Sequence, residues 1–149
     1  MRKIAWLVVI IITNCVCQAQ IPVSWKYVSK KVSDKTFEVH ITATIQRGWH
    51  LYSQTQPADA IAVPTSIKFN VHPLIKLNGK PKETGTLEKY TERSLGIEQW
   101  QYSNKVEFVQ TVTLKSNVKT TIKGNIEYQA CTDEKCLPPK VVLFSVRLE

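Results

Sequence analysis

The 149-residue sequence predicts an all-β domain, an immunoglobulin-like antiparallel β-sandwich. Three observations support this fold class. Apolar and polar residues alternate with the period of a strand in several segments, glycine and proline turn signals separate those segments, and no long stretch follows the helical period. Several short strands with turn signals between them are typical of such a sandwich. We find no internal repeat and no low-complexity linker.

The clearest predicted strand lies between residues 37 and 45. There Phe37, Val39 and Ile41 alternate with Glu38 and His40, so one face of the strand is expected to be buried and the other to be wet. Breaks between strands are predicted at Asn78-Gly79, at Lys123-Gly124-Asn125 and at the prolines. The predicted strands, in chain order, occupy residues 23–27, 37–45, 106–114, 118–130 and 142–148.

Residues 84–104, "TGTLEKYTERSLGIEQWQYSN", lack a clean alternation and contain mixed charges and two glycines. This composition predicts either a long loop or a frayed hairpin. Long loops in compact domains often carry function, although a merely irregular connection would look the same.

The N-terminus has the features of a secretory signal peptide. Arg2 and Lys3 precede an apolar run at residues 4–12, which is shorter than the ~20 residues of a membrane-spanning helix. Cys17 and Ala19 place small residues at the −3 and −1 positions of a cleavage site before Gln20. We therefore predict a signal peptide at residues 1–19, a mature domain at 20–149, and no stable membrane insertion after cleavage. A lipid anchor on Cys15 or Cys17 is the alternative, but the residues before each fit it poorly.

The formal net charge of +8 falls by two when Arg2 and Lys3 are removed with the signal. The remaining lysines are scattered, and no arginine-rich stripe with interleaved aromatic residues is present. This distribution indicates a solvated surface and argues against nucleic-acid binding. About 130 mature residues are enough for a hydrophobic core, so the domain does not need a disulfide merely to fold.

Signal cleavage leaves Cys131 and Cys136, and an even pair in an exported protein indicates a disulfide. The pair brackets residues 132–135, a predicted turn between two strands. A bond there closes a very small loop, for which the chain-entropy estimate is ~2 kcal/mol, against ~4 or more for a 100-residue loop. Such a bond is poorly placed as a staple and well placed for exchange at an exposed turn. A structural bond, a redox pair and a metal site remain open at this point.

A metal site would need further ligands, and the three histidines do not supply a recognisable pattern. His40, His50 and His72 lack the close spacing to a second ligand that zinc sites show. His40 is expected on the outer face of a strand, and His72 precedes Pro73 in a predicted turn. We therefore expect no metal.

The segment "YQACTDEKCLPP" resembles the active-site hairpin of the periplasmic N-terminal domain of the thiol:disulfide interchange protein DsbD. "RGWHLYSQ" at residues 47–54 resembles the Gly-aromatic-aromatic-Leu-Tyr segment of the same family. The resemblance spans roughly Val23 to Leu148, and the cysteine hairpin is its specific part. It implies an immunoglobulin-like sandwich, in agreement with the strand pattern.

By this resemblance Cys131 and Cys136 are the redox pair and no cofactor is used. Tyr52 matches a tyrosine that lines the family's active site, and His50 falls at a position for an aromatic residue beside it. The family covers its cysteines with a cap loop that bears a phenylalanine beside acidic residues. The corresponding segment is "ERSLG", with Leu95 nearest the capping position. The aromatic cap and its paired acids are not reproduced, although Tyr90, Trp100 or Tyr102 could take that place.

The resemblance implies a periplasmic domain that receives electrons from a membrane partner and passes them to oxidised exported proteins. Full-length relatives continue into a membrane domain and a thioredoxin-like domain, whereas this sequence ends at Glu149. The expected partners are therefore a thioredoxin-like protein or a membrane electron-transfer protein in trans. The alternative is a non-enzymatic β-sandwich for binding or adhesion with a structural hairpin disulfide.

Overall fold

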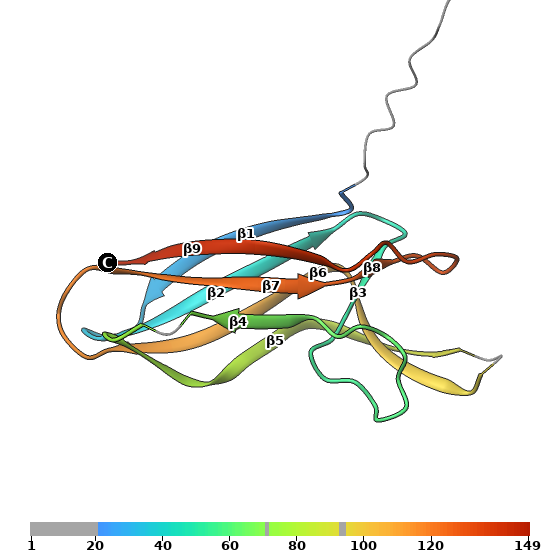
Figure 1. Ribbon diagram of the computed structural model, residues 1–149, viewed down its shortest axis with the longest axis horizontal. Helices are drawn as coiled ribbons and strands as arrows, with labels where there is room; N and C mark the ends of the chain where they lie inside the picture. Colours follow the sequence, from blue (N-terminus) through green and yellow to red (C-terminus); the bar gives the residue numbers. More distant parts are fainter. Residues whose placement is uncertain (1–20, 71, 93–94) are drawn as a thin grey trace, which may run out of the picture.

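The computed structural model describes residues 21–70, 72–92 and 95–149, and in these ranges the chain forms strands, turns and loops without a helix. Two antiparallel sheets pack face to face, which confirms the predicted all-β sandwich (Figure 1). The strands are β1 (Val23–Lys31), β2 (Thr36–Ile45), β3 (His50–Tyr52), β4 (Ser66–Phe69), β5 (Ile75–Glu92), β6 (Ile97–Leu114), β7 (Thr120–Tyr128), β8 (Ala130–Cys131) and β9 (Lys140–Leu148).

The larger sheet has the strand order β1-β2-β6-β3-β8, and β5 pairs with β6. The smaller sheet has the order β4-β7-β9. Strand β6 is long enough to pair β2 along residues 105–113 and β3 along residues 101–103, with β5 beside it. The two sheets also meet at one margin, where the Ser29 hydroxyl on β1 donates a 2.6 Å hydrogen bond to the Arg147 carbonyl on β9.

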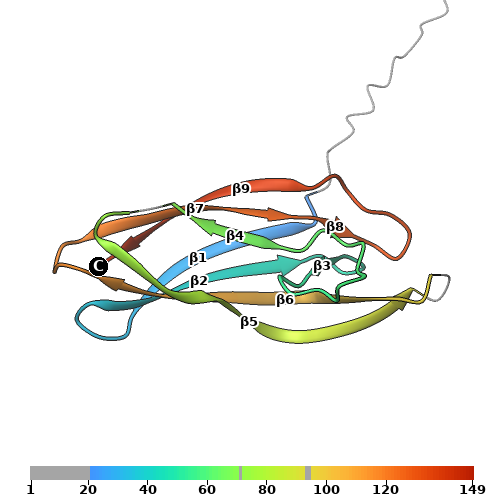
Figure 2. The same ribbon diagram turned by 60° about the horizontal axis from the view of Figure 1, so that its bottom comes forward.

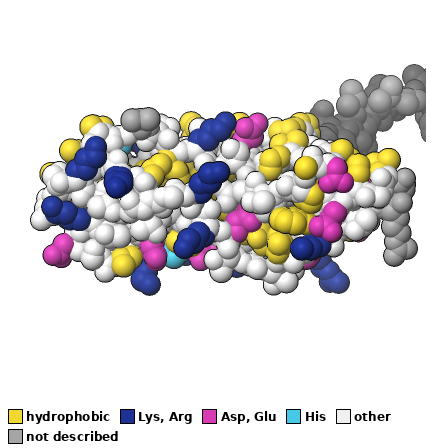
Figure 3. All heavy atoms as spheres, turned by 90° about the horizontal axis from the view of Figure 1, so that it is seen from below, with side chains coloured by type: hydrophobic (Ala, Val, Ile, Leu, Met, Phe, Trp, Pro, Cys, Tyr) yellow, Lys and Arg dark blue, Asp and Glu magenta, His cyan; other side chains and the backbone are white. Residues whose placement is uncertain are grey.

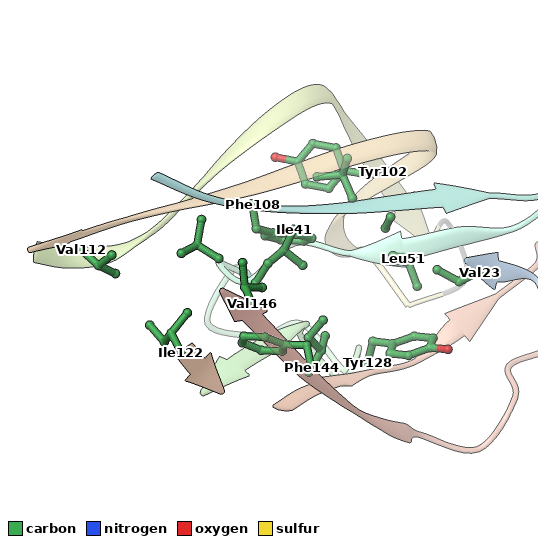
Figure 4. Close-up of a cluster of buried hydrophobic side chains, with 14 of the residues drawn as sticks. Val23, Ile41, Leu51, Tyr102, Phe108, Val112, Ile122, Tyr128, Phe144 and Val146 are labelled. Atoms are coloured by element: carbon green, nitrogen blue, oxygen red, sulfur yellow. The ribbon is translucent and has the colours of Figure 1, made fainter. Parts of the chain in front are cut away.

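The core lies between the sheets and follows from the alternation seen in the sequence (Figure 4). Ile41 and Phe108 point inward from the larger sheet, and Ile122 and Phe144 point inward from the smaller one. Each such fully buried side chain contributes roughly 1.5–3 kcal/mol through the hydrophobic effect. Trp25 extends the core along β1, with its ring 5.3 Å from that of Tyr128. The sandwich therefore has a core that does not depend on the cysteine pair.

The five predicted strands are all present, and their bounds are longer than predicted in most cases. The predicted break at residues 123–125 is wrong, because Gly124 lies in the middle of β7. A Cβ atom at Gly124 would meet the Lys68 carbonyl of β4 and the ring of Phe144 on β9. Because glycine has no side chain, it allows β4 and the Phe144 ring to approach β7 closely, which is one of the known reasons for a glycine inside a strand.

The segment at residues 84–104 is a hairpin, so the long-loop alternative is wrong. Strands β5 and β6 stay paired from Leu87↔Tyr102 to Glu92↔Ile97 and form an arm that extends from the sandwich (Figure 2). The register shifts between Gly85 and Leu87, opposite Asn104, which has a φ of 63°. Such a bulge changes which residues face the core, and this explains why the sequence showed no continuous alternation.

The register of β5 shifts a second time between Asn78 and Lys82. A buried side chain from β6 hydrogen-bonds to backbone carbonyls at this shift. Gln110 is 1% exposed and donates from Nε2 to the carbonyls of Asn78 at 3.2 Å and Thr111 at 2.7 Å. The predicted break at Asn78-Gly79 is thus a bulge inside β5, where Gly79 has a φ of 73°. A left-handed backbone position of this kind suits glycine.

Two histidines take structural places away from the cysteines. His40 on β2 lies 3.4 Å from the Glu38 carboxylate and 3.3 Å from that of Glu107. His72 accepts a 3.2 Å hydrogen bond from the Leu74 amide at Nδ1. Within the described ranges, no group of three or more histidine, cysteine or acidic residues is arranged as a metal site.

The described part of the chain contains no helix long and apolar enough to cross a membrane.

Candidate functional site

Cys131 and Cys136 form a disulfide across a four-residue turn, with their Cα atoms 4.0 Å apart. The turn is closed by the Thr132 amide, which donates to the Lys135 carbonyl at 2.7 Å. The Thr132 hydroxyl oxygen in turn accepts from the amides of Glu134 and Lys135, at 3.2 Å and 3.1 Å. Such side-chain bonding to the following backbone is the usual role of threonine in turns. The hairpin therefore holds its shape with hydrogen bonds of its own.

The two sulfur-bearing residues differ in their exposure to solvent. Cys131 is 0% exposed and lies on β8, which pairs with β3 at the edge of the larger sheet. Cys136 is exposed at the far side of the turn. After it, the Leu137 amide donates to the Ala130 carbonyl at 2.9 Å, which fixes the exit of the chain. A disulfide with one buried and one exposed sulfur can be attacked from solvent at only one of its ends.

Strand β3 brings two residues of the "RGWHLYSQ" segment against the cysteine hairpin. In this three-residue strand His50 pairs with Cys131, and Leu51 pairs with Ala130. The His50 and Tyr52 rings lie edge to face with centroids 5.3 Å apart, and His50 Nε2 and the Tyr52 hydroxyl are within hydrogen-bond distance at 3.4 Å. Both predicted site residues are therefore beside the disulfide.

Beside the disulfide lies a cleft of about 420 Å³ at one end of the sandwich. The cysteine hairpin, the tip of the β5–β6 arm and the loop after β3 gather at this end (Figures 1 and 2). The residues that line the cleft come from the cysteine hairpin, the β5–β6 arm, the loop after β3 and β3 itself: His50, Tyr52, Ile61, Ala62, Tyr90, Glu92, Gln99, Gln101, Gln129, Thr132, Asp133, Glu134, Lys135 and Cys136.

The cleft has acidic and apolar walls. Glu92, Asp133 and Glu134 contribute carboxylates, whereas Ile61 and Tyr90 expose apolar surface. On the face seen in Figure 3, hydrophobic and acidic side chains gather toward the end that carries the cysteine hairpin, and lysines and arginines are scattered along the length. A mixed surface of this kind can receive a protein partner more readily than a nucleic acid.

Burial controls the titration of the two ring side chains in the cleft. Desolvation lowers the pKa of His50, and the nearby Asp133 and Glu88 carboxylates oppose this by favouring the charged ring. Desolvation raises the pKa of Tyr52, and Tyr90 adds to the increase. Both side chains are therefore held toward their neutral forms.

The loop between β3 and β4, which supplies Ile61 and Ala62 to the cleft, is tied to the β5–β6 arm. Gln56 donates from Nε2 to the Trp100 carbonyl at 2.6 Å and accepts from the Trp100 amide at 3.0 Å. This amide side chain thus imitates a strand partner for β6. The Thr65 hydroxyl closes the other end of the loop with a 2.6 Å bond to the Tyr52 carbonyl.

The structure brings together four of the five predicted site residues: Cys131, Cys136, His50 and Tyr52. Leu95 lies at the tip of the β5–β6 arm, is 61% exposed, and is absent from the cleft lining. Arg93 and Ser94 of the predicted cap segment lie outside the described residues, as does the predicted signal peptide.

Among the three aromatic alternatives for the cap, Tyr90 lines the cleft. Trp100 instead donates a hydrogen bond from its ring nitrogen to Glu98. Tyr102 is buried, and its hydroxyl donates a hydrogen bond to Glu83.

Sequence reasoning missed the polar residues of the arm that face the cleft. Gln99 and Gln101 are both 8% exposed and belong to its lining. Their only sequence signal is the two-residue spacing in the "EQWQ" segment, and the bulge at Asn104 separates this spacing from the alternation of the rest of β6. The site therefore depends on a register that the sequence pattern does not reveal.

Comparison with protein families matches residues 18–148 to the N-terminal domain of thiol:disulfide interchange protein DsbD. Comparison with curated proteins gives no match. Among solved structures, the chain is similar to the Neisseria meningitidis DsbD N-terminal domain in its reduced form. The TM-score is 0.51 at 20% identity, covering 80% of this chain and 82% of that one.

Two further structures share the fold. The complex between the DsbD and PilB N-terminal domains from Neisseria meningitidis matches with a TM-score of 0.56 at 19% identity, covering 89% of this chain and 88% of that one. The N-terminal periplasmic domain of ScsB from Proteus mirabilis matches with a TM-score of 0.55 at 14% identity, covering 87% of this chain and 47% of that one. At these identities the structures establish the fold, whereas the family match covers nearly the whole chain. The chain belongs to the family of the N-terminal domain of the thiol:disulfide interchange protein DsbD.

Proposed function

We propose that this domain exchanges thiols and disulfides with other exported proteins by cycling the Cys131–Cys136 pair between disulfide and dithiol. It passes electrons from a thioredoxin-like protein or a membrane electron-transfer protein to oxidised proteins. No cofactor takes part, because the two cysteines carry both electrons themselves. Cys131 and Cys136 are the reacting residues, and His50, Tyr52 and Leu95 are assigned to their surroundings.

The exchange proceeds in two steps that balance electrons and protons. In the reduced domain the Cys136 thiolate attacks a disulfide of the oxidised partner, forms a mixed disulfide, and releases one partner thiolate. The Cys131 thiol then loses its proton and attacks the Cys136 sulfur. The Cys131–Cys136 disulfide forms and the second partner thiolate leaves, so the domain is oxidised and the partner is reduced by two electrons.

The observation that carries this proposal is the position of the disulfide at the cleft. Cys136 is exposed and lines the cleft, whereas Cys131 is buried behind it. A structural bond would gain most by joining distant segments, but this one closes a loop with a sequence separation of 5. Family membership supports the same chemistry.

The proposed partner follows from the surface around the disulfide and from a relative. The cleft presents exposed Ile61 and Tyr90 beside carboxylates, a suitable surface for a transient protein contact. A DsbD N-terminal domain has been solved in complex with the PilB N-terminal domain. We therefore assign the cleft to the contact with a partner protein that carries its own cysteine.

The proposed compartment is the periplasm, with residues 1–19 removed as a signal peptide. The N-terminal domain of ScsB, which shares the fold, is periplasmic. Mass spectrometry of the intact exported protein should give the mass of a chain that begins at Gln20. A diacylglycerol adduct on Cys15 or Cys17 would contradict this assignment.

The second candidate is a non-enzymatic binding module with a structural disulfide, and the hydrogen bonds within the turn are compatible with it. The reduction potential of the pair separates the two functions. We expect a value above about −300 mV, because structural disulfides usually lie below this value. The purified domain would be equilibrated in thiol buffers of graded potential, its free thiols blocked, and the reduced fraction measured by mass. A potential clearly below that boundary would favour the structural function.

A further inference from the structure

The second step of the proposed exchange, on which this inference rests, places an unusual demand on Cys131. Its side chain is 0% exposed, so water cannot reach the thiol freely once the pair is reduced in this geometry. A thiol in buried surroundings loses its proton less readily than one in water, and only the thiolate attacks a disulfide. The resolving step therefore needs a proton acceptor that is itself buried next to the Cys131 thiol.

His50 is the titratable side chain that the fold places for this task. It is the antiparallel partner of Cys131 across the β3–β8 ladder, so both side chains leave the sheet on the same face. Directly opposed residues in such a ladder have Cβ atoms about 4.5–5.5 Å apart, within reach of an imidazole ring. His50 is 7% exposed and also lines the cleft together with Cys136. Its ring orientation is limited by the contact of Nε2 with the Tyr52 hydroxyl at 3.4 Å.

The surroundings of His50 keep its ring in the proton-accepting form. Burial lowers the pKa of His50 below 6.5, against the opposite effect of Asp133 in the cysteine turn and Glu88 on β5. A neutral imidazole at neutral pH can accept a proton, and the two carboxylates stabilise the imidazolium that results. The remaining titratable groups around the cleft are Tyr52 on β3, Tyr90 and Glu92 on β5, and Glu134 and Lys135 in the turn.

We infer that His50 accepts the proton of the Cys131 thiol in the step that resolves the mixed disulfide. The proton moves from the Cys131 sulfur to a nitrogen of the His50 ring, and the new thiolate attacks the Cys136 sulfur. The Cys131–Cys136 bond forms as the bond between Cys136 and the partner breaks, and the leaving thiolate takes the electron pair. In the reverse direction the His50 imidazolium returns the proton to Cys131.

A small aromatic disulfide, dithiobis(2-nitrobenzoate), tests this step because each of the two thiol attacks releases one coloured thionitrobenzoate. Attack by Cys136 on the reagent releases the first, and attack by Cys131 on the resulting mixed disulfide releases the second. Rapid mixing of the reduced domain with the reagent therefore gives two phases that can be followed at a series of pH values. The Cys131→Ser variant retains the first phase only and so identifies the second.

We expect His50→Gln to slow the second phase about 100-fold at neutral pH, the lower end of the effect of a positioned base, while the first phase changes little. In the unaltered domain the rate of the second phase should be level through neutral pH. It should fall in acid with a midpoint below 6.5, as His50 becomes protonated. In His50→Gln the rate should instead rise in proportion to the hydroxide concentration.

His40→Gln is the matched control, because His40 lies on β2 between Glu38 and Glu107 and is absent from the cleft lining. This variant should reproduce both phases and their pH profiles. Equal second-phase rates and pH profiles in His50→Gln and the unaltered domain would overturn the role of His50 while leaving the exchange function intact. Failure of the unaltered domain to release either thiolate would instead contradict the proposed function.

Circular dichroism establishes whether His50→Gln folds. If it does not, the pH profile of the unaltered domain decides the question without it. A level second phase with an acid inflection supports the proton acceptor, and a rate proportional to hydroxide throughout the range overturns it.

Discussion

The Tyr102 hydroxyl on β6 donates a 2.9 Å hydrogen bond to the Glu83 carboxylate on β5. The same carboxylate accepts from the Ser53 hydroxyl at 2.6 Å and from the Gln54 amide at 2.6 Å. Three donors from two parts of the chain thus converge on one side chain. This network connects the start of the loop that forms one wall of the cleft to the base of the β5–β6 arm.

Substitution of Glu83 by glutamine should destabilise the domain. The glutamine side chain keeps the shape of glutamate but loses its charge. Its NH₂ group would replace one carboxylate oxygen and would face hydrogen-bond donors that it cannot accept from. We expect the free energy of unfolding to fall by about 1–3 kcal/mol, the usual cost when a hydrogen-bonded charged group is lost and its partners are left unsatisfied. Urea denaturation followed by fluorescence measures this change. Glu127→Gln on β7, in the other sheet, serves as the control and should change stability by less than about 0.5 kcal/mol.

The same network predicts a loss of stability in alkali. Burial raises the pKa of Tyr102 well above 10.0, with further increases from the hydrogen bond to Glu83 and from its charge. The folded state therefore keeps a proton that the unfolded chain releases near pH 10. Stability from this group is fully present below the unfolded pKa and is lost as pH rises above it. The urea midpoint should fall between about pH 9 and about pH 11, and Tyr102→Phe should show a smaller fall. Identical slopes in the two proteins would mean that Tyr102 does not contribute.

The fold should survive reduction of the disulfide. Most of the core between the sheets comes from strands β1, β2, β6, β7 and β9, and the bond closes only a small loop with a sequence separation of 5. Its loss should cost ~2 kcal/mol on the chain-entropy estimate. A domain with the ordinary stability of ~5–15 kcal/mol tolerates this loss. Circular dichroism with and without a reductant should give the same β spectrum, whereas global unfolding on reduction would favour the structural-disulfide function.

The two cysteines should differ in their ability to form a bond with a partner. Cys136 is exposed and Cys131 is buried, so an attacking sulfur from another protein reaches Cys136. We expect Cys131→Ser to give a stable mixed disulfide with a thioredoxin-like protein whose single cysteine has first been converted to a mixed disulfide with thionitrobenzoate, because the Cys136 thiolate attacks that cysteine and thionitrobenzoate leaves. Cys136→Ser should give little or none. Non-reducing gel electrophoresis measures both yields, and a reversed order would exchange the assigned roles without removing the redox chemistry.

Local patterns in the sequence predicted much of the sandwich. The alternation around Ile41 and Phe108 identified the inward faces of β2 and β6, because a strand exposes its two faces in turn and one of them must be buried. The turn between Cys131 and Cys136 was also predictable, since residues five apart at the end of a strand can meet only if the chain reverses. Strands β3 and β4 were not predicted, because segments of three and four residues are too short to show a period. Strand β5 was not predicted as a strand either, because two register shifts interrupt its alternation.

The sequence by itself determined the all-β class, the family signature and the pairing of the two cysteines, all of which depend on residues close together in the chain. Tertiary structure alone decided that His50 would lie opposite Cys131, that Gln99 and Gln101 would face the same cleft, and that Leu95 would not. These placements depend on which strands become neighbours and on bulges that shift the register. A shift of one residue turns a side chain to the other face of the sheet, and long-range packing rather than local alternation selects between the two outcomes.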